Sequence, residues 1–274
     1  MLISANLLKI DYRASSEWWV ETQIAPLGVH SLYNGELNTV QPAIMAIQPS
    51  PDNQELIKYL QGVIWDLDGV LIDSMEIHFK IWQKVFSEYG VLFDREHFNR
   101  HFGTTNLETI TSVLGNRLTP EESRVLAEKK QAQFEQQAIR DAGLIPGVKT
   151  WLAYFQQSGI PQAVASSNAQ QFIESITSHL KISAYFHAIV SAENLASKPN
   201  PAVFLESARH IQAHPTRCLV FEDAIAGIEG AKRAGMKCIA ITTTNPPDAL
   251  AGADLIIPAF SALSADQLIH VMKS

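Results

Sequence analysis

Residues 61–74 read Gln-Gly-Val-Ile-Trp-Asp-Leu-Asp-Gly-Val-Leu-Ile-Asp-Ser. A short apolar run ends abruptly in two carboxylates, Asp66 and Asp68, and a glycine follows. Side chains two residues apart on an extended chain project to the same face, so these carboxylates repel each other unless a cation, a proton or a charged substrate compensates. The stretch indicates a metal site at a strand end, where one carboxylate acts as nucleophile while its neighbour moves protons. An ordinary strand-to-turn junction is the alternative interpretation.

Two further apolar runs end in groups suited to binding phosphate. Ser166, Ser167 and Asn168 follow one run, and their hydroxyl and amide groups can hydrogen-bond phosphate oxygens together with the N–H groups of a following helix. A plain helix N-cap is the alternative for this segment. Lys198 follows the other run in a loop with two prolines, which stiffen the segment and fix where the lysine can reach. A solvated loop lysine is the alternative there.

A fourth apolar run, residues 218–221, ends in the adjacent acids Glu222 and Asp223. They are either an acidic pair at a helix N-terminus, which the helix dipole favours, or part of a site for a hard cation such as Mg²⁺. All four segments lie just past the C-terminal end of a short apolar run. In open α/β sheets those ends line the ligand crevice, so the four together indicate one site.

The four segments, in this order, resemble the motifs of the haloacid dehalogenase (HAD) superfamily, in the branch with a helical cap inserted after the first motif. The resemblance covers roughly residues 61–274 and is greatest to the group of β-phosphoglucomutases and small sugar-phosphate phosphatases. The matching positions are Asp66-Leu67-Asp68-Gly69-Val70 for the first motif, Ser166 for the second, Lys198 for the third and Glu222-Asp223 for the fourth.

The resemblance implies a phosphoryl-transfer mechanism. Asp66 would attack phosphorus in line and form an aspartyl-phosphate, which splits one hard step into two. Asp68 would give a proton to the leaving oxygen and then take one from the group that attacks the phospho-enzyme. The true dehalogenases of the superfamily lack the second acid and Mg²⁺, so Asp68 favours phosphoryl transfer over carbon–halogen cleavage.

The resemblance also implies Mg²⁺ as cofactor. Asp66, the backbone carbonyl of Asp68 and Asp223 would hold the ion, with Glu222 beside them, and the ion would offset the repulsion between carboxylates and phosphate. Lys198 and Ser166 would bind the transferring phosphoryl oxygens, where charge is spread in the transition state.

The fold predicted for the core is a doubly wound parallel sheet. Helix and strand signals alternate from residue 143 to the C-terminus, which argues for an α/β, Rossmann-like architecture. We predict a HAD core of residues 61–74 and 143–274. The strand-like runs lie near 162–165, 187–190, 218–221, 238–242 and 254–257.

Residues 75–142 are predicted to form a small helical cap domain, hinged near Asp73–Ser74 and near Gly143–Gly147. Thr119 and Pro120 suit the N-cap and first position of a long helix that runs to about Ile139. Closure of the cap would exclude water and complete the site.

Substrate specificity is expected in this cap. By resemblance, His78 and Trp82 match positions that face the active site, and Lys130 matches a cap lysine more loosely; packing in the cap core is the alternative for Trp82. The cap loop includes Thr105 and Asn106. In β-phosphoglucomutases an arginine of this loop grips the second phosphate, and Asn106 stands in its place. A neutral amide supplies no bidentate charged clamp, so the sequence favours a phosphatase over a mutase.

The composition bounds the remaining classes of function. The 274 residues carry a formal net charge of −7, which argues against a general nucleic-acid binder, and no apolar run approaches a membrane span. We expect a cytoplasmic monomer that acts on a small phosphorylated metabolite, by resemblance a sugar phosphate; nucleotide-like and polyol phosphates stay open. Cys218 and Cys238 are expected to pack in the core.

Three expectations concern parts that the motifs do not explain. Residues 1–60 form an N-terminal extension expected to be poorly ordered over residues 1–50; either Met45 is the real start, or the segment packs on the core or mediates association. His97 and His101 have a metal-binding spacing, but no third ligand is evident, so solvated cap histidines are expected. A catalytically idle binding module on the same fold is the distant alternative, against which the retention of every catalytic group argues.

Overall fold

The computed structural model describes residues 55–101 and 104–274. The expectations for Met45 and for residues 1–50 lie outside the described residues, as does Gly103 of the cap loop. The described end of the N-terminal extension packs against the core, because Leu56 and Leu60 are buried and the Glu55 carboxylate pairs with Lys273 at 2.5 Å.

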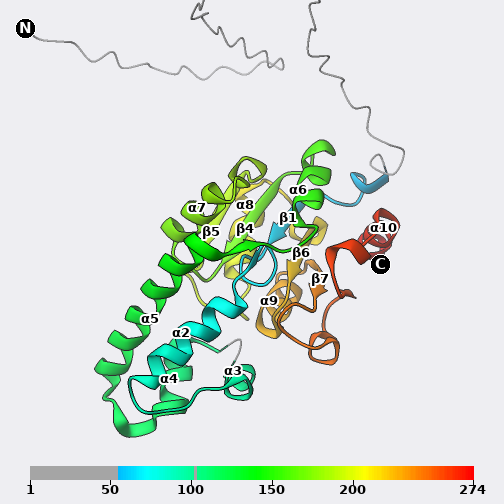
Figure 1. Cartoon of the computed structure of the whole chain (residues 1–274). Coiled ribbons are helices and arrows are strands. Elements are labelled where there is room, and N and C mark those ends of the chain that lie inside the picture. Colours follow the sequence, from blue (N-terminus) through cyan, green and yellow to red (C-terminus); the bar gives the residue numbers. More distant parts are fainter. Residues whose placement is uncertain (1–54, 102–103) are drawn as a thin grey trace, which may run out of the picture. The chain divides into compact units, whose positions relative to one another are not determined.

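A six-stranded parallel sheet forms the centre of the molecule, in the order β5-β4-β1-β6-β7-β8 (Figure 1). The winding reverses at β1, which pairs with β4 on one side and with β6 on the other. This reversal creates the kind of crevice in which open α/β sheets bind ligands. The strands are β1 (Gly62–Trp65), β4 (Gln162–Ser166), β5 (Ala188–Ser191), β6 (Cys218–Glu222), β7 (Lys237–Ile241) and β8 (Leu255–Ile257).

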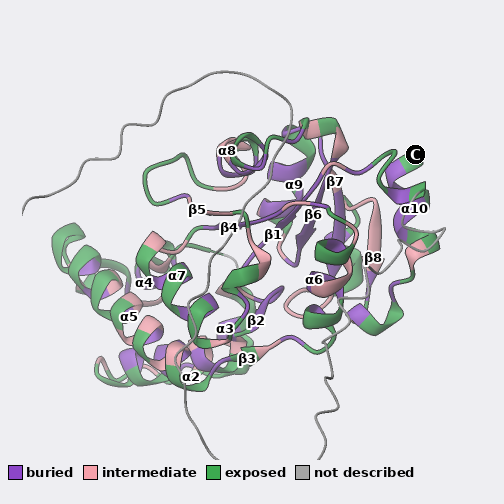
Figure 2. Cartoon of the chain, turned by 90° about the horizontal axis from the view of Figure 1, so that it is seen from above, coloured by how far each residue is buried: buried purple, intermediate pink, exposed green. Residues whose placement is uncertain are grey.

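Helices cover both faces of this sheet (Figure 2). The central strands β1 and β6 are therefore buried along their whole length, and they are apolar except for Glu222 at the end of β6. Val63 and Trp65 of β1 belong to one core cluster, together with residues of α6 (Val148–Gln157), α7 (Gln170–His179) and α10 (Ala265–Lys273). Ile64 belongs to the opposite cluster, together with α8 (Ala202–His210) and α9 (Ile225–Arg233). The alternation follows from the period of two along a strand. Cys218 and Cys238 are buried free thiols of the second cluster, as expected.

Inserted helices separate β1 from β4. The insertion begins and ends at a two-stranded antiparallel ribbon of β2 (Ile72–Asp73) and β3 (Gly143–Leu144). Its helices are α2 (Met75–Ser87), α3 (Arg95–His101), α4 (Asn106–Leu114) and α5 (Pro120–Asp141). The described residues also form short 3₁₀ helices: η1 (Gly115–Arg117) lies in the insertion, and η2 (Ser183–Tyr185), η3 (Pro215–Arg217), η4 (Pro247–Leu250) and η5 (Phe260–Ala262) follow in the core. The predicted fold class, a parallel α/β core with an inserted helical cap, is confirmed.

Helix α5 begins as its sequence predicts. The Thr119 hydroxyl accepts from the backbone N–H of Glu122, whose carboxylate in turn accepts from the backbone N–H of Thr119, and Pro120 follows the cap. The buried stripe of α5 then runs Leu126, Lys130, Phe134 and Ala138, at a spacing of four. Lys130 thus occupies a position that an apolar side chain would normally fill. The helix ends at Asp141, slightly beyond the predicted Ile139.

Candidate active site

The loop after β1 places two acids at the centre of the sheet edge. Gly69 has φ +74°, and a Cβ at this position would overlap the carboxylate of Asp223. Only glycine therefore allows the loop to turn so tightly against β6. Asp66 and Asp68 precede this glycine and have different partners: Asp66 accepts from Lys198, whereas Asp68 accepts from Ser74 and Asn168.

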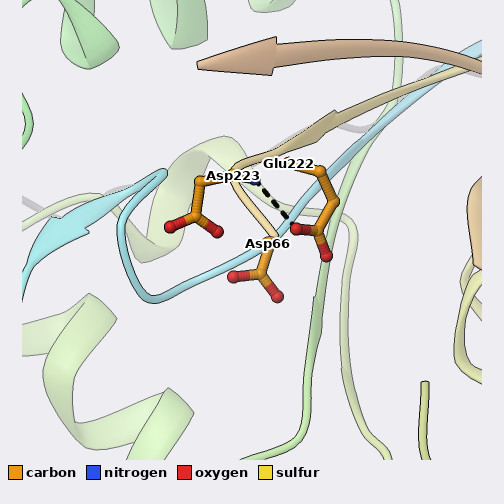
Figure 3. Close-up of side chains that lie close together, drawn as sticks. All are labelled: Asp66, Glu222 and Asp223. Atoms are coloured by element: carbon orange, nitrogen blue, oxygen red, sulfur yellow. Dashed lines mark hydrogen bonds between the residues drawn. The ribbon is translucent and has the colours of Figure 1, made fainter. Parts of the chain in front are cut away.

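Three carboxylates converge where β1 and β6 end. Ligand oxygens of Asp66, Glu222 and Asp223 lie within 4.8 Å of one another, and all three residues are buried (Figure 3). Burial raises the pKa of Asp66 and of Asp223, and repulsion from Glu222 raises both further. Carboxylate oxygens are the ligands that Mg²⁺ prefers. The donor set therefore fits a hard divalent cation, which would relieve the repulsion.

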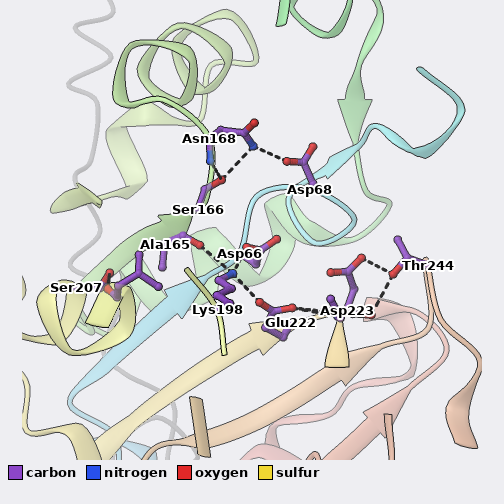
Figure 4. A network of polar contacts seen from close by, with 12 residues as sticks. Asp66, Asp68, Ala165, Ser166, Asn168, Lys198, Ser207, Glu222, Asp223 and Thr244 are labelled. Carbon is purple, nitrogen blue, oxygen red and sulfur yellow. Dashed lines mark hydrogen bonds and ion pairs between the residues drawn. The ribbon is translucent and has the colours of Figure 1, made fainter. Parts of the chain in front are cut away.

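Lys198 is the counter-charge within this cluster. Its ammonium donates to Asp66 Oδ1 and to Glu222 Oε1, the latter at 2.6 Å (Figure 4). Burial alone would lower the pKa of Lys198, but Asp66 and Glu222 together raise it. The second Glu222 oxygen accepts from the backbone N–H groups of Asp223 and Ala224, at 2.9 and 3.0 Å. One lysine thus faces three carboxyl groups, so it cannot pair with all of them at once.

Asp68 is held apart from the cluster by two hydrogen bonds. Its Oδ1 accepts from the Ser74 hydroxyl and its Oδ2 from the Asn168 amide, each at 2.6 Å. Burial raises the pKa of Asp68, and these two donors partly oppose the rise. A carboxyl group with a raised pKa and a fixed orientation suits a residue that both gives and takes a proton. The Asn168 amide also donates to Ser166 Oγ at 3.1 Å, which ties the β4 end to the same centre.

A fifth strand end contributes residues that the sequence analysis did not identify. After β7, the Thr244 hydroxyl donates to Asp223 Oδ2 at 2.6 Å, and the Asn245 amide donates to the Asp223 carbonyl at 2.9 Å. The available signal was the same as for the other four segments, since polar residues follow the apolar run 238–241 directly. Together these contacts fix the orientation of Asp223.

The inserted helices bring a separate group of side chains to the cavity. Lys130 Nζ lies 2.9 Å from His78 Nδ1 and 3.0 Å from Asn106 Oδ1. Burial lowers the pKa of Lys130 to about 7. Burial, and then Lys130, lower the pKa of His78 well below its usual value, so its imidazole is neutral at pH 7. Lys130 also lies 4.8 Å from the Trp82 ring centroid, a cation–π distance.

Trp82 and Thr105 have structural roles in addition to their positions at the cavity. Trp82 is buried and stacks on Phe86 with a centroid distance of 5.1 Å, as the core-packing alternative predicts. The Thr105 hydroxyl accepts from the backbone N–H of Glu108 and caps α4.

A cavity of about 580 Å³ lies between the inserted helices and the sheet edge. Every site residue that the sequence predicts contributes to its wall, including Ser167. Gln131 and Glu135 of α5 also line it, and they were not predicted. His97 and His101 bind Asp94 and Ser112 at 2.7 and 2.9 Å. Among the described residues, the group of His, Cys, Asp and Glu side chains close enough to hold a metal is the carboxylate cluster instead.

These features define a class of α/β enzyme: a parallel sheet whose strand ends carry buried carboxylates, a lysine and hydroxyl groups beneath inserted helices. A model of the haloacid dehalogenase-like hydrolase family matches residues 63–241. The chain belongs to this family, which confirms the predicted resemblance and the prediction of an enzyme. Among residues 55–101 and 104–274, no helix is long and apolar enough to cross a membrane.

Relatives in this family carry two kinds of name. The chain is 32% identical over 219 residues to the β-phosphoglucomutase of Bacillus subtilis, covering 77% of this chain and 94% of the relative. It is 29% identical to a fructose-1-phosphate phosphatase of Escherichia coli, covering 65% and 94%. The crystal structure of a HAD hydrolase from Entamoeba histolytica has the same fold, with a TM-score of 0.72 at 22% identity over 78% of this chain and 100% of that one.

Proposed function

We propose that the protein is a Mg²⁺-dependent phosphatase that hydrolyses a small phosphate monoester, of the sugar-phosphate class, through an aspartyl-phosphate on Asp66. The observation that carries this proposal is that the acids fall into two groups with different partners. Lys198 is paired with Asp66 in a cluster suited to a cation, while Asp68 stands apart on two hydrogen bonds. A nucleophile and a separate acid–base group are what phosphoryl transfer in two steps requires.

In the first step, an Asp66 oxygen forms a bond to phosphorus as the bond between phosphorus and the leaving oxygen breaks. Asp68 donates its proton to that oxygen, so the product leaves as a neutral alcohol. In the second step, Asp68 takes a proton from water as the water oxygen attacks phosphorus. Inorganic phosphate leaves and the Asp66 carboxylate is restored. Lys198 and Ser166 hold the phosphoryl oxygens throughout, with Ser167 and Asn168 in the same loop.

Mg²⁺ would be held by Asp66, Asp223 and the Asp68 backbone carbonyl, with Glu222 beside them. When bound, it supplies positive charge that offsets repulsion between the carboxylates and the phosphate. The convergence of three buried carboxyl groups and the two donors that orient Asp223 support this assignment.

The substrate is proposed to carry one phosphate. Among the described residues that line the cavity, Lys130 and Lys198 are the only lysines or arginines. Lys198 is engaged at the reacting centre, and burial brings the pKa of Lys130 to about 7. Asn106 is neutral, so the far side of the cavity has no permanent cation with which to grip a second phosphate. His78, Trp82, Thr105 and Asn106 are proposed to contact the rest of the substrate.

A phosphomutase of the β-phosphoglucomutase type is the second candidate. It is favoured by the position of Lys130, whose ammonium lies 3.0 Å from Asn106 and supplies a partial positive charge there, and by the mutase name of one relative. A mutase must hold and reorient a bisphosphate, whereas a phosphatase only needs water to reach the phospho-enzyme.

The test is product analysis with β-glucose 1-phosphate, a trace of glucose 1,6-bisphosphate and Mg²⁺, using wild type and Asp66→Asn. Inorganic phosphate without an isomerised sugar phosphate supports the phosphatase, and a panel of sugar, polyol and nucleotide phosphates then finds the substrate. Glucose 6-phosphate from wild type alone establishes the mutase instead. A folded wild type that forms no glucose 6-phosphate and releases no phosphate from any ester, including aryl phosphates with Mg²⁺, contradicts both and favours a binding module.

We also propose that residues 75–142 act as a cap that closes on the core of residues 61–74 and 143–274, pivoting at the ribbon of β2 and β3. The antiparallel ribbon supports this, because the inserted helices leave and rejoin the core at one place. The enzyme is further proposed to be a cytoplasmic monomer, since the inserted helices already cover the site.

A further inference from the structure

A line of side-chain hydrogen bonds runs from the inserted helices to Asp68. Lys130 Nζ donates to Asn106 Oδ1 at 3.0 Å, and Asn106 Nδ2 donates to Gln131 Oε1 at 3.0 Å. Gln131 Nε2 donates to Asn168 Oδ1 at 2.9 Å, and Asn168 Nδ2 donates to Asp68 Oδ2 at 2.6 Å. The first three residues belong to α4 and α5, and the last two follow β4 and β1. The line therefore joins the two sides of the cavity.

Every bond in this line runs in one direction, from Lys130 to Asp68. A protonated Lys130 only donates, and a carboxyl oxygen of Asp68 that carries no proton only accepts. With these ends, each amide turns its oxygen toward the lysine and its NH₂ toward the acid. Hydrogen bonds aligned in one direction polarise and strengthen one another. A change at any one amide thus affects the bond that reaches Asp68.

His78 lies between Lys130 and the other oxygen of Asp68. When Lys130 Nζ donates to His78 Nδ1 at 2.9 Å, the proton of the neutral imidazole sits on Nε2. That nitrogen lies 4.0 Å from Asp68 Oδ1, which is beyond hydrogen-bond distance. The amide line is therefore the hydrogen-bonded connection from Lys130 to the carboxyl group that the proposed reaction uses for proton transfer.

Gln131 is the member of the line that crosses from the insertion to the core. It is half-buried on α5, and the Phe134 ring on the same helix packs on Phe172 of α7, with a centroid distance of 5.7 Å. Without the Gln131 donor, Asn168 loses the partner of its oxygen while Ser166 Oγ stays within reach of its NH₂ group, at 3.1 Å. Asn168 would then be free to turn away from Asp68.

We propose that Gln131 and Asn106 are positioning residues for Asp68: they act through Asn168 to aim the Asp68 carboxyl group at the leaving oxygen. This inference rests on the proposed function, in which Asp68 protonates that oxygen. The inserted helices would then orient the Asp68 carboxyl group as well as cover the substrate.

Phenyl phosphates of graded leaving-group ability test this role, because they have nearly the same shape but differ in their need for a proton. 4-Nitrophenol departs readily as the anion, whereas phenol needs protonation as the bond breaks. The quantity to compare is kcat/KM, which covers only the steps up to departure of the phenol. Gln131→Met keeps the size of the side chain and removes its three hydrogen bonds, to Asn106, Glu135 and Asn168. Gln136→Met, at an exposed position of the same helix, is the matched control.

Gln131→Met is expected to lower kcat/KM for phenyl phosphate by about tenfold or more, a part of what a general acid contributes, and for 4-nitrophenyl phosphate by less than about threefold. Gln136→Met should leave both values unchanged. Gln131→Glu keeps the acceptor for Asn106 but cannot donate to Asn168, so this variant should lose activity as Gln131→Met does. If Gln131 serves packing alone, Gln131→Glu should instead have the activity of wild type.

An equal loss on all phenyl phosphates, or a rise in KM alone, would overturn the positioning role and show that Gln131 contacts substrate or only supports the helix. Unfolding midpoints of all variants separate these outcomes from a general loss of structure. If wild type hydrolyses no phosphate ester, the proposed function fails and this inference fails with it. If wild type is active and the Gln131 variants match it on both substrates, only this inference fails.

Discussion

The two sides of the cavity differ in the kind of polar groups that they bury. On the sheet side, ionisable groups are buried together: Lys198 is paired with Asp66 and Glu222, beside Asp223. On the side of the inserted helices, the groups are neutral or easily neutralised, since burial lowers the pKa of Lys130 to about 7 and keeps His78 uncharged. Amides connect the two sides. This difference fits the proposal that the sheet side performs the covalent chemistry, while the helices orient groups and discriminate substrates.

The largest expected effect tests the chemistry assigned to the sheet side. Asp66→Asn removes the proposed nucleophile and should reduce kcat by about 10⁴-fold or more, the scale seen when a covalent catalyst loses its nucleophile. Phosphate release with Mg²⁺ measures this, and acid-quenched wild type should contain a phosphoryl group that the variant lacks. Residual activity above about a hundredth of wild type would place the nucleophile elsewhere.

The next largest effect tests whether the sheet side depends on paired charges. Lys198→Met leaves Asp66 and Glu222 buried without their counter-charge, so the free energy of unfolding should fall by about 3–5 kcal/mol in metal-free buffer. Urea denaturation measures it. Lys232→Met is the control, because Lys232 is 40% exposed and its pair with Asp254 should contribute about 0–1 kcal/mol. An equal loss of unfolding free energy in the two variants would mean that the buried ion pairs of Lys198 contribute no more to stability than an exposed pair.

On the side of the inserted helices, Lys130 is expected to lower the free energy of unfolding. The pKa of Lys130 is about 7 in the folded protein and near 10.4 in an unfolded chain. Below about pH 7 the folded state carries a buried charge. Between about pH 7 and 10 the folded state has released the proton while the unfolded chain keeps it, so stability rises with pH in this window. Lys130→Met should therefore raise Tm most at pH 6, by at least about 2–4 °C, and the gain should shrink toward pH 10.

Thermal unfolding from pH 6 to 10 measures this difference. Lys129→Met is the matched control, because Lys129 is the adjacent residue of α5 and is 52% exposed. A gain that is equal at both pH values, or that also appears in the control, would show that the effect is apolar packing and that Lys130 titrates normally.

The smallest effect concerns the helix that carries Lys130 and Gln131. Thr119→Ala removes the N-cap of α5 and should cost about 1 kcal/mol of unfolding free energy, with kcat/KM unchanged, because the cap lies at the far end of the helix from the cavity residues. Thr119→Ser keeps the hydroxyl and should restore most of the loss. A matching fall in kcat/KM would mean that the catalytic geometry depends on the whole length of α5.

Much of the sheet side could be predicted from the sequence because its signals are local. Each short apolar run predicts a buried strand. The polar residues that follow it, such as Asp66 and Glu222, predict the edge of the sheet where the site lies. Thr244 follows the same rule and was overlooked. The position of Lys198 is harder to predict, because an apolar run and a proline-containing loop do not show that its ammonium contacts the end of β1.

The helix side was predicted less completely. Periodicity marks the stripe of α5 that faces inward, but Lys130 interrupts that stripe, and the resemblance rather than the pattern drew attention to it. Gln131 gave no signal, because a glutamine on a helix is ordinary until the loop that it meets is known. Glu135 was missed for the same reason.

The strands, the cap of α5 and the type of chemistry could be predicted, because they depend on residues close together in the chain. Which polar groups meet depends on the tertiary fold. The Asp68–Asn168 bond joins residues 100 positions apart, and the Lys198–Asp66 pair spans 132. Contacts over such separations depend on how the sheet reverses at β1 and how α5 packs on α7. No local pattern encodes that packing, and it converts separate strand ends and helix faces into one site.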